Sequence, residues 1–336
     1  MHSHNAASGT YTLSEFKPPW WATNRHVQTI YPRFMQARAK IEQTRSRLNL
    51  PDGDFVDLVW VGDITTCKAL VVLFHGLEGS MRSHYANDMA ANLHRQGYAV
   101  VLMHFRGCGG DANVLTRAYH SGDTADAWFF LNTLQEQYPN IMKFGMGFSL
   151  GANMLLKLVG EYVEQDILKA VFCVSPPLQL AECALAINHG FARVYQSHLL
   201  KSMVRKLIAK MQYIDYSGVL KITEPDAEKL QSFREFDEHV TAPLHGFEGA
   251  DDYYQKNSAM GYLASIATPT LILHAKDDPF MNHNVIPQEA QLSPKVQYEL
   301  SDNGGHVGFM QGSPWRPKIW LHERANTFIS QFISSE

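Results

Sequence analysis

The sequence predicts an α/β fold with a mostly parallel central sheet and helices on both of its faces. Short, wholly apolar runs alternate along the chain with amphipathic helical stretches, as in parallel strands joined by crossover helices. A Gly-x-Ser-x-Gly stretch stands where one such run gives way to a helix. A long helical segment later interrupts the alternation. Together these observations predict one α/β core that carries a helical insertion.

The individual elements follow from local patterns, taken in chain order. Residues 45–50 and 55–60 flank a Pro-Asp-Gly-Asp stretch, which predicts an antiparallel hairpin. After this hairpin the apolar runs are continuous rather than alternating, as expected for strands buried on both faces. The expected strands are 69–74, 99–103, 141–146, 168–174, 270–274 and 296–300, and the expected helices are 85–93, 124–134, one from residue 150 onward, and 319–333.

The predicted core is discontinuous along the chain. Residues 1–15 are expected to be disordered, residues 16–177 and 263–336 form the core, and residues 178–262 form a helical cap inserted over a pocket. Within the cap, residues 198–211 carry an apolar stripe with Lys201, Arg205, Lys206 and Lys210 off it. This stripe either packs on the domain below or gives the helix a weak contact with an anionic lipid surface.

Composition excludes several classes of protein. The chain has 336 residues, 45% of them hydrophobic and 18% charged, and a net charge of −4, which argues against nucleic-acid binding. No secretory signal and no transmembrane segment are evident. The four cysteines form no C-x-x-C pair, which fits a reduced compartment and predicts a cytoplasmic protein; no motif indicates a metal. Oligomeric state is left open.

Ser149 is the predicted nucleophile. It is the serine of Gly147-Phe148-Ser149-Leu150-Gly151, between an apolar strand and an amphipathic helix. A serine on so sharp a turn is forced into a strained backbone conformation, and side chains at the flanking glycines would collide with the strand or the helix. The strain leaves the hydroxyl exposed at the sheet edge, beside the positive end of the helix dipole. The alternative is a serine that merely caps the helix.

An activated serine needs a base and a group that orients the base, here in the chain order serine, acid, histidine. The acid is expected after the strand that follows the cap, where Asp278 precedes a proline; Asp277 is the second choice, as a turn-stabilising side chain. The histidine is expected on the loop after the last strand, where Gly304 and Gly305 precede His306. Ser149, Asp278 and His306 are therefore the predicted catalytic residues.

The tetrahedral oxyanion of such a reaction needs preorganised donors. One is expected from the backbone N–H of Leu150, directly after the nucleophile. The other is expected from the His-Gly loop that follows the 69–74 strand, from the N–H of Leu77. An ordinary strand-to-helix turn is the simpler interpretation of that loop.

With these motifs the chain resembles the α/β-hydrolases, and more narrowly the YheT-like family of esterases and hydrolases. The resemblance runs from about residue 16 to the C-terminus. It is carried by Pro18-Pro19-Trp20, Asn24-Arg25-His26-Val27-Gln28-Thr29, HGLEGS at 75–80, FRGCGG at 105–110, YHSG at 119–122, GFSLGAN at 147–153 and HAKDDPF at 274–280.

The resemblance implies a serine hydrolase of carboxylic esters with the triad Ser149, Asp278 and His306 and no cofactor. Similar eukaryotic proteins are membrane-associated lipid hydrolases with an N-terminal anchor, a feature we do not expect here. Arg106 and His120 belong to family segments; Arg106 either binds an anionic group of the substrate or, as we favour, holds its loop by a buried ion pair.

We therefore expect a carboxylesterase acting on small-molecule esters of short or medium acyl chains. Two alternatives stay open. The same triad would serve a thioesterase or an amidase or peptidase, and a peptidase would need a cap carboxylate to hold the substrate amine, with Glu224, Asp226, Glu235, Asp237 and Glu238 as candidates. The second alternative is a non-catalytic binding protein on a hydrolase scaffold.

Overall fold

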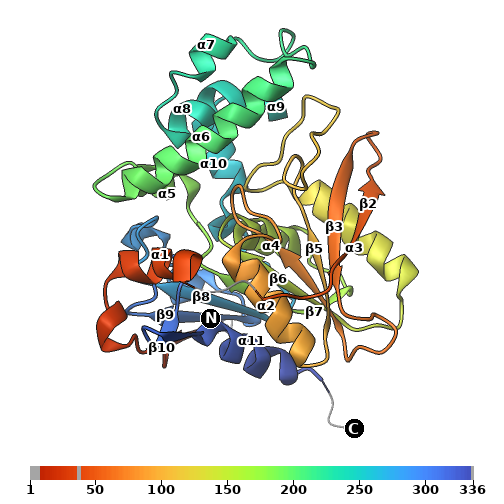
Figure 1. Cartoon of the computed structure of the whole chain (residues 1–336), viewed down its shortest axis with the longest axis vertical. Coiled ribbons are helices and arrows are strands. Elements are labelled where there is room, and N and C mark those ends of the chain that lie inside the picture. Colours follow the sequence, from red (N-terminus) through yellow and green to blue (C-terminus); the bar gives the residue numbers. More distant parts are fainter. Residues whose placement is uncertain (1–7, 36–38, 334–336) are drawn as a thin grey trace, which may run out of the picture.

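A nine-stranded sheet forms the centre of the molecule in the computed structural model, which describes residues 8–35 and 39–333 (Figure 1). The strand order is β1-β9-β8-β7-β6-β4-β5-β3-β2; all neighbours pair parallel except β2 with β3 and β3 with β5. The predicted mostly parallel α/β fold is thus confirmed. The strands are β1 (Thr10–Leu13), β2 (Thr44–Asn49), β3 (Phe55–Val61), β4 (Leu70–Phe74), β5 (Ala99–Met103), β6 (Lys143–Phe148), β7 (Leu168–Val174), β8 (Thr270–Ala275) and β9 (Val296–Ser301).

Helices cover both faces of this sheet. Helices α3 (Thr124–Gln137) and α4 (Leu150–Glu161) bury one face, and α2 (His84–Arg95) and α11 (Trp320–Ser330) bury the other. Strand β4 shows why its sequence is continuously apolar. Leu70, Val72 and Phe74 pack in the cluster with α3 and α4, whereas Val71 and Leu73 pack in the cluster with α2 and α11.

The segment between β7 and β8 contains helices and no strand over residues 178–262, all of which are described. These helices form a layer at the top of Figure 1, apart from the sheet, and we call them the cap helices. Leu200 and Leu207 of the expected apolar stripe are buried in a cluster of the cap itself. The cap helices are α5 (Leu180–Ile187), α6 (Ala192–Met211), α7 (Glu224–Ala227), α8 (Phe233–Phe236), α9 (Ala242–His245) and α10 (Ala250–Asn257).

The expectation that residues 1–15 are disordered is wrong for the described part of that segment. Thr10–Leu13 form β1, which pairs parallel with β9 at the edge of the sheet, and residues 1–7 lie outside the described residues. The strand forms because an edge strand needs only one partner, and Ser14 adds a hydrogen bond of 2.7 Å from its hydroxyl to the Glu299 carboxylate. The N-terminal chain then continues into α1 (Arg25–Met35). Beyond β9, β10 (Met310–Ser313) and β11 (Arg316–Ile319) form a separate hairpin.

Three stretches of backbone meet where β6 turns into α4. A Cβ atom at Gly147 would lie 2.6 Å from the Cα of Ala152, and one at Gly151 would lie 2.4 Å from the carbonyl oxygen of His75. Real Cβ atoms do not approach backbone so closely. The two glycines therefore let β4, β6 and α4 pack together at the point where Ser149 stands.

Replacing Gly151 by alanine is expected to lower the free energy of unfolding by about 1–3 kcal/mol, because the added methyl group meets fixed backbone. Gly261→Ala is the matched control, since a Cβ atom there meets nothing within 4 Å. It should change stability by no more than about 0.5 kcal/mol. Urea unfolding of both variants checks this, and equal effects would contradict it.

Candidate active site

Ser149 stands between β6 and α4 in a backbone conformation that few residues adopt. Its φ is 52° and its ψ is −119°. Its own carbonyl oxygen accepts hydrogen bonds from the N–H groups of Ala152 and Asn153 at 2.9 and 3.0 Å, which start the helix. No side-chain hydrogen bond caps the helix, so the alternative of a helix-capping serine finds no support. A non-glycine residue at positive φ costs about 1–3 kcal/mol and persists only where its surroundings impose it.

The structure brings His306 and Asp278 to Ser149. Nε2 of His306 lies 2.9 Å from Oγ of Ser149, and Nδ1 of His306 lies 2.8 Å from Oδ2 of Asp278. The second oxygen of Asp278 accepts a hydrogen bond of 2.8 Å from the N–H of Phe280, and the side chain of Asp278 is 1% exposed. The ring of Phe280 stacks on the imidazole of His306, with centroids 4.0 Å apart. The imidazole is therefore held on its edge and its face.

Asp277, the second choice for the acid, has a different role. Its carboxylate accepts a hydrogen bond of 2.9 Å from the N–H of Gly305, on the loop that carries His306. Burial raises the pKa of the Asp277 carboxyl above its usual value. Asp277 thus holds the histidine loop, which agrees with the turn-stabilising side chain expected from the sequence.

The His-Gly loop after β4 is fixed by three side chains. The Tyr85 hydroxyl accepts from the N–H of Gly76 at 2.9 Å, and the Tyr119 hydroxyl accepts from the N–H of Glu78 at 2.9 Å. Burial lowers the pKa of His75 to about 3, so its ring is neutral at pH 7. Nδ1 of that ring lies 2.7 Å from the Gly76 carbonyl, and Nε2 accepts from the N–H of Phe105 at 3.1 Å.

These contacts leave the two expected oxyanion donors available. Within the described residues, neither the N–H of Leu77 nor that of Leu150 donates a hydrogen bond to the protein. Both residues line the same cavity as Ser149 and His306. The two N–H groups therefore remain the candidates for stabilising negative charge there.

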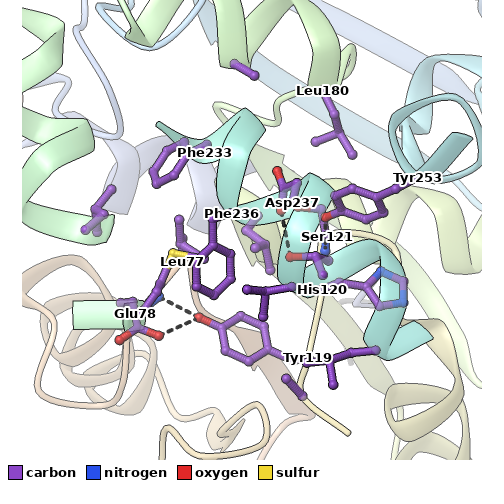
Figure 2. A pocket seen from close by; sticks show the side chains of 18 of the residues that line it. Leu77, Glu78, Tyr119, His120, Ser121, Leu180, Phe233, Phe236, Asp237 and Tyr253 are labelled. Carbon is purple, nitrogen blue, oxygen red and sulfur yellow. Dashed lines mark hydrogen bonds between the residues drawn. The ribbon is translucent and has the colours of Figure 1, made fainter. Parts of the chain in front are cut away.

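Glu78 links this loop to the cap. One carboxylate oxygen accepts from the Tyr119 hydroxyl at 2.9 Å, as the dashed lines in Figure 2 show. The other accepts from the hydroxyl of Ser202 at 2.6 Å and lies 2.9 Å from Nζ of Lys206, both on α6. Lys210 of α6 donates a hydrogen bond of 2.5 Å to the Leu115 carbonyl. Two of the four basic residues expected off the stripe thus bind the core.

A cavity of about 200 Å³ opens at Ser149 and extends beneath the cap helices. Its walls are mainly apolar, and Figure 2 shows Leu180, Phe233 and Phe236 on the cap side facing Leu77 and Tyr119 on the core side. The apolar lining from the cap is Leu180, Ala184, Ile187, Leu199, Met203, Leu207, Phe233, Phe236, Val240 and Leu244.

A cluster of polar side chains, His120, His245 and Asp237, also lines the cavity. His120 and His245 form an edge-to-face pair with centroids 4.5 Å apart, and burial lowers the pKa of each to about 3. Asp237 accepts hydrogen bonds from the hydroxyls of Thr241 and Tyr254 at 2.7 and 2.8 Å. Burial raises the pKa of Asp237 to about 6. At neutral pH the two histidines are therefore uncharged, and the carboxylate is already engaged by two hydroxyls.

Arg106 is held in a buried ion-pair network. Its guanidinium makes two hydrogen bonds to Asp126, at 2.6 and 2.7 Å, and also contacts Asp52 at 2.7 Å and Asp54 at 3.3 Å. The side chain of Arg106 is 1% exposed. Its donors are thus occupied by carboxylates of the protein, which matches the structural role that the sequence favoured.

The described residues offer neither a metal site nor a membrane-spanning helix. No group of three or more His, Cys, Asp or Glu side chains in residues 8–35 and 39–333 could hold a metal ion. None of the helices described there is long and apolar enough to span a bilayer.

A mostly parallel sheet, a strained serine at a strand-to-helix turn and a histidine between that serine and a buried aspartate define the class of the α/β hydrolases. A model of the alpha/beta hydrolase fold matches residues 69–313, so the chain belongs to this family. Within the family it belongs to the YheT-like group. It is 41% identical to YheT of Escherichia coli (strain K12) over 325 residues, which are 96% of this chain and 95% of YheT.

Two further comparisons are more distant. The chain is 28% identical over 272 residues to the monoacylglycerol lipase of Saccharomyces cerevisiae, covering 79% of this chain and 60% of the lipase. The crystal structure of the Pyrococcus furiosus esterase Pf2001 superimposes with a TM-score of 0.57 at 17% identity, covering 99% of this chain and all of the esterase. The second likeness supports the fold alone.

Several residues at the site were not singled out by sequence reasoning. Ser175 has a φ of 50°, is fully buried and accepts a hydrogen bond of 3.2 Å from the N–H of Val307 beside His306. Glu78 and Phe280 lie in family motifs, but their motifs do not say what they contact. Their roles depend on partners far away in the chain, which no local pattern reveals.

Replacing Arg106 by methionine is expected to lower the free energy of unfolding by about 3–5 kcal/mol, since Asp54 and Asp126 would be left buried without their partner. Arg234→Met is the matched control because the Arg234–Asp251 pair is exposed, and such pairs contribute about 0–1 kcal/mol. Guanidinium unfolding measures both. A loss at Arg106 no larger than that at Arg234 would contradict the structural role.

Proposed function

We propose that the protein is a serine hydrolase of carboxylic esters with short or medium acyl chains. The observation that carries this proposal is the continuous contact from Ser149 Oγ through the His306 ring to the buried Asp278, at 2.9 and 2.8 Å. Its membership of the α/β hydrolases agrees with hydrolytic chemistry. The relative named monoacylglycerol lipase agrees with an ester as substrate.

In the acylation step, His306 Nε2 takes the proton of the Ser149 hydroxyl as the oxygen attacks the ester carbonyl. Asp278 holds the Nδ1–H tautomer of the ring and stabilises the imidazolium that forms. The carbonyl oxygen becomes an oxyanion, which accepts hydrogen bonds from the N–H groups of Leu77 and Leu150. Collapse of this intermediate breaks the ester C–O bond, and the imidazolium gives its proton to the departing alcohol.

Deacylation repeats these steps with water. His306 removes a proton from the water as it attacks the acyl-enzyme, and the same two N–H groups hold the second oxyanion. The bond to Ser149 Oγ then breaks, the serine recovers its proton from His306, and the carboxylic acid leaves. Asp278 keeps its hydrogen bond to Nδ1 throughout without taking the proton, and no cofactor is needed.

The mainly apolar cavity favours a substrate whose buried part is an apolar acyl group. Its volume of about 200 Å³ is smaller than the roughly 300–1,000 Å³ of sites for drug-sized ligands. Transfer of a methylene group from water to such a site contributes about 0.8 kcal/mol. A chain that fills the cavity should therefore be preferred until its length exceeds the space between Ser149 and the cap helices.

A peptidase finds less support than an esterase. Of the five cap carboxylates that could hold a substrate amine, Asp237 lines the cavity, but two hydroxyls already bind it and burial raises its pKa to about 6. Glu224, Asp226, Glu235 and Glu238 do not line the described cavity. The same triad would attack a thioester carbonyl in the same way, so acyl-thioesters belong in the substrate series.

A non-catalytic binding protein also finds little support. That alternative would be favoured by a serine distant from the histidine or by a filled pocket. Oγ of Ser149 and Nε2 of His306 are instead within hydrogen-bond distance. Phe148 is 1% exposed and packs against Tyr85, and the cavity is open at Ser149.

Ser149→Ala tests the proposal directly. Wild-type protein is expected to hydrolyse p-nitrophenyl acetate and butyrate and to be labelled by a fluorophosphonate. The variant should lose at least about 10³-fold in kcat and all labelling, because the attacking oxygen is gone. Thermal unfolding should show the variant folded. An inert wild type, or a variant as active as wild type, would rule the proposal out.

Ala184→Phe tests whether the cavity holds the acyl chain. The larger side chain fills the cavity wall, so we expect kcat/KM for octanoate esters to fall at least about tenfold while that for acetate esters stays within about threefold. Leu185→Phe is the matched control: it lies next along α5 and is 55% exposed. The same loss of kcat/KM with both esters, or with both variants, would show that the acyl chain does not bind in this cavity.

A further inference from the structure

The loop that carries His306 is strained, and local sequence does not explain what holds it. Val307 has a φ of 60° and Phe309 a φ of 46°. A β-branched residue such as valine is rarely found there, and each such residue costs about 1–3 kcal/mol. The loop must therefore be held by neighbouring parts of the protein.

Helix α1 supplies much of this support. The Thr29 hydroxyl accepts a hydrogen bond of 3.0 Å from the N–H of His306 and donates one of 2.8 Å to the Arg25 carbonyl. Because the Thr29 hydroxyl donates to a carbonyl one turn earlier in α1, its oxygen is oriented to accept from the N–H of His306. Gln28, with no exposed surface, accepts from the N–H of Met310 at 2.6 Å and donates to the Met310 carbonyl at 3.2 Å. Both ends of the strained stretch are therefore tied to α1.

The glycines of the loop make this contact close enough. A Cβ atom at Gly305 would lie 2.6 Å from the carbonyl oxygen of Arg25 and 2.7 Å from Oγ1 of Thr29. One at Gly308 would lie 2.2 Å from the carbonyl oxygen of Gln28. Pro32 has no N–H to donate to that carbonyl, so this turn of the helix is open on the side facing the loop.

A second route connects α1 to the face of the catalytic ring. Nδ1 of His26 lies 3.0 Å from the Tyr195 hydroxyl on α6. Tyr195 packs against Phe280, with centroids 5.0 Å apart, and Phe280 stacks on His306. The same short segment, Asn24–Thr29, therefore reaches His306 through its backbone and through its ring.

We infer that α1 is part of the catalytic machinery, with Thr29 as a positioning residue that sets where His306 stands relative to Ser149. The inference rests on the proposed function. It assigns a role to a segment that lies outside the 69–313 span matched by the hydrolase-fold model. Thr29 does not itself line the cavity and acts through the backbone of His306.

Thr29→Val tests the inference, since it keeps the shape of the side chain and removes the acceptor. We expect kcat for p-nitrophenyl butyrate and the rate of fluorophosphonate labelling to fall about 10- to 100-fold, with KM within about threefold of wild type. Thr29→Ser restores the acceptor and should recover most of the activity. Thr29→Ala, which also lacks the acceptor, is expected to behave as Thr29→Val does.

Thr133→Val on α3 is the matched control. The Thr133 hydroxyl also donates to the carbonyl four residues earlier, at 2.9 Å, and Thr133 does not line the cavity. The Thr133→Val variant shows how much the free energy of unfolding falls when such a side-chain hydrogen bond within a helix is lost. Urea unfolding of Thr29→Val and Thr133→Val compares the two losses.

The outcomes separate this inference from the proposed function. A wild type that is inert, unlabelled and no different from Ser149→Ala overturns both. An active wild type overturns only the inference if Thr29→Val keeps the activity of Thr133→Val, if Thr29→Ser is as slow as Thr29→Val, or if KM rises in place of a fall in kcat.

Discussion

The backbone at Ser149 is the constraint on which the rest of the site depends. Ser149 has a φ of 52° because β4, β6 and α4 pack closely around it. Gly147 and Gly151 allow this close packing, since a Cβ atom at either position would collide with backbone. The strain is small beside the packing that imposes it: the side chains along these three elements are almost all buried. The Ser149 hydroxyl is therefore positioned once the sheet and α4 have packed together. The backbone of Ser149 keeps its strained conformation as long as the core is folded.

Two more strained points surround this one. Ser175 has a φ of 50° at the end of β7, and Val307 has a φ of 60° in the histidine loop. A hydrogen bond of 3.2 Å joins the N–H of Val307 to Oγ of Ser175. Neighbouring segments thus hold each other in conformations that none would adopt alone, and this mutual support fixes the distances around the imidazole. Rigid positioning of this kind is what general base chemistry by a histidine requires.

Much of the core could be predicted because its signals are local. Continuous apolar runs gave the positions of β4 to β9, and the Gly-x-Ser-x-Gly stretch and the chain order pointed to Ser149, Asp278 and His306. β1 was missed because Thr10–Leu13 is short, mixed in polarity and paired with only one neighbour. α1 gave no helical expectation, since Pro32 lies inside it.

The supporting contacts could not be predicted for a different reason. Thr29 and His306 are 277 residues apart, and Glu78 and Ser202 are 124 apart. Nothing in the composition of either segment indicates its partner, because hydroxyls and carboxylates can be satisfied by water or by many other groups. Such pairs exist only after the sheet has brought distant loops to one edge. The residues that meet at the candidate site could thus be named from the sequence, but the contacts that hold them in place could not.

The carboxylate of Glu78 has a consequence for how the cap of this protein could be exchanged. One of its oxygens is bound by Tyr119 of the core and the other by Ser202 and Lys206 of the cap, while its own N–H follows that of Leu77 in the chain. Lining residues Leu199, Met203 and Leu207 share α6 with those two anchors. A foreign cap grafted onto this scaffold would thus remove the Ser202 and Lys206 contacts of Glu78 together with the apolar side chains that α6 adds to the cavity. The cap of this protein is therefore not a module that could be exchanged independently of the loop beneath it.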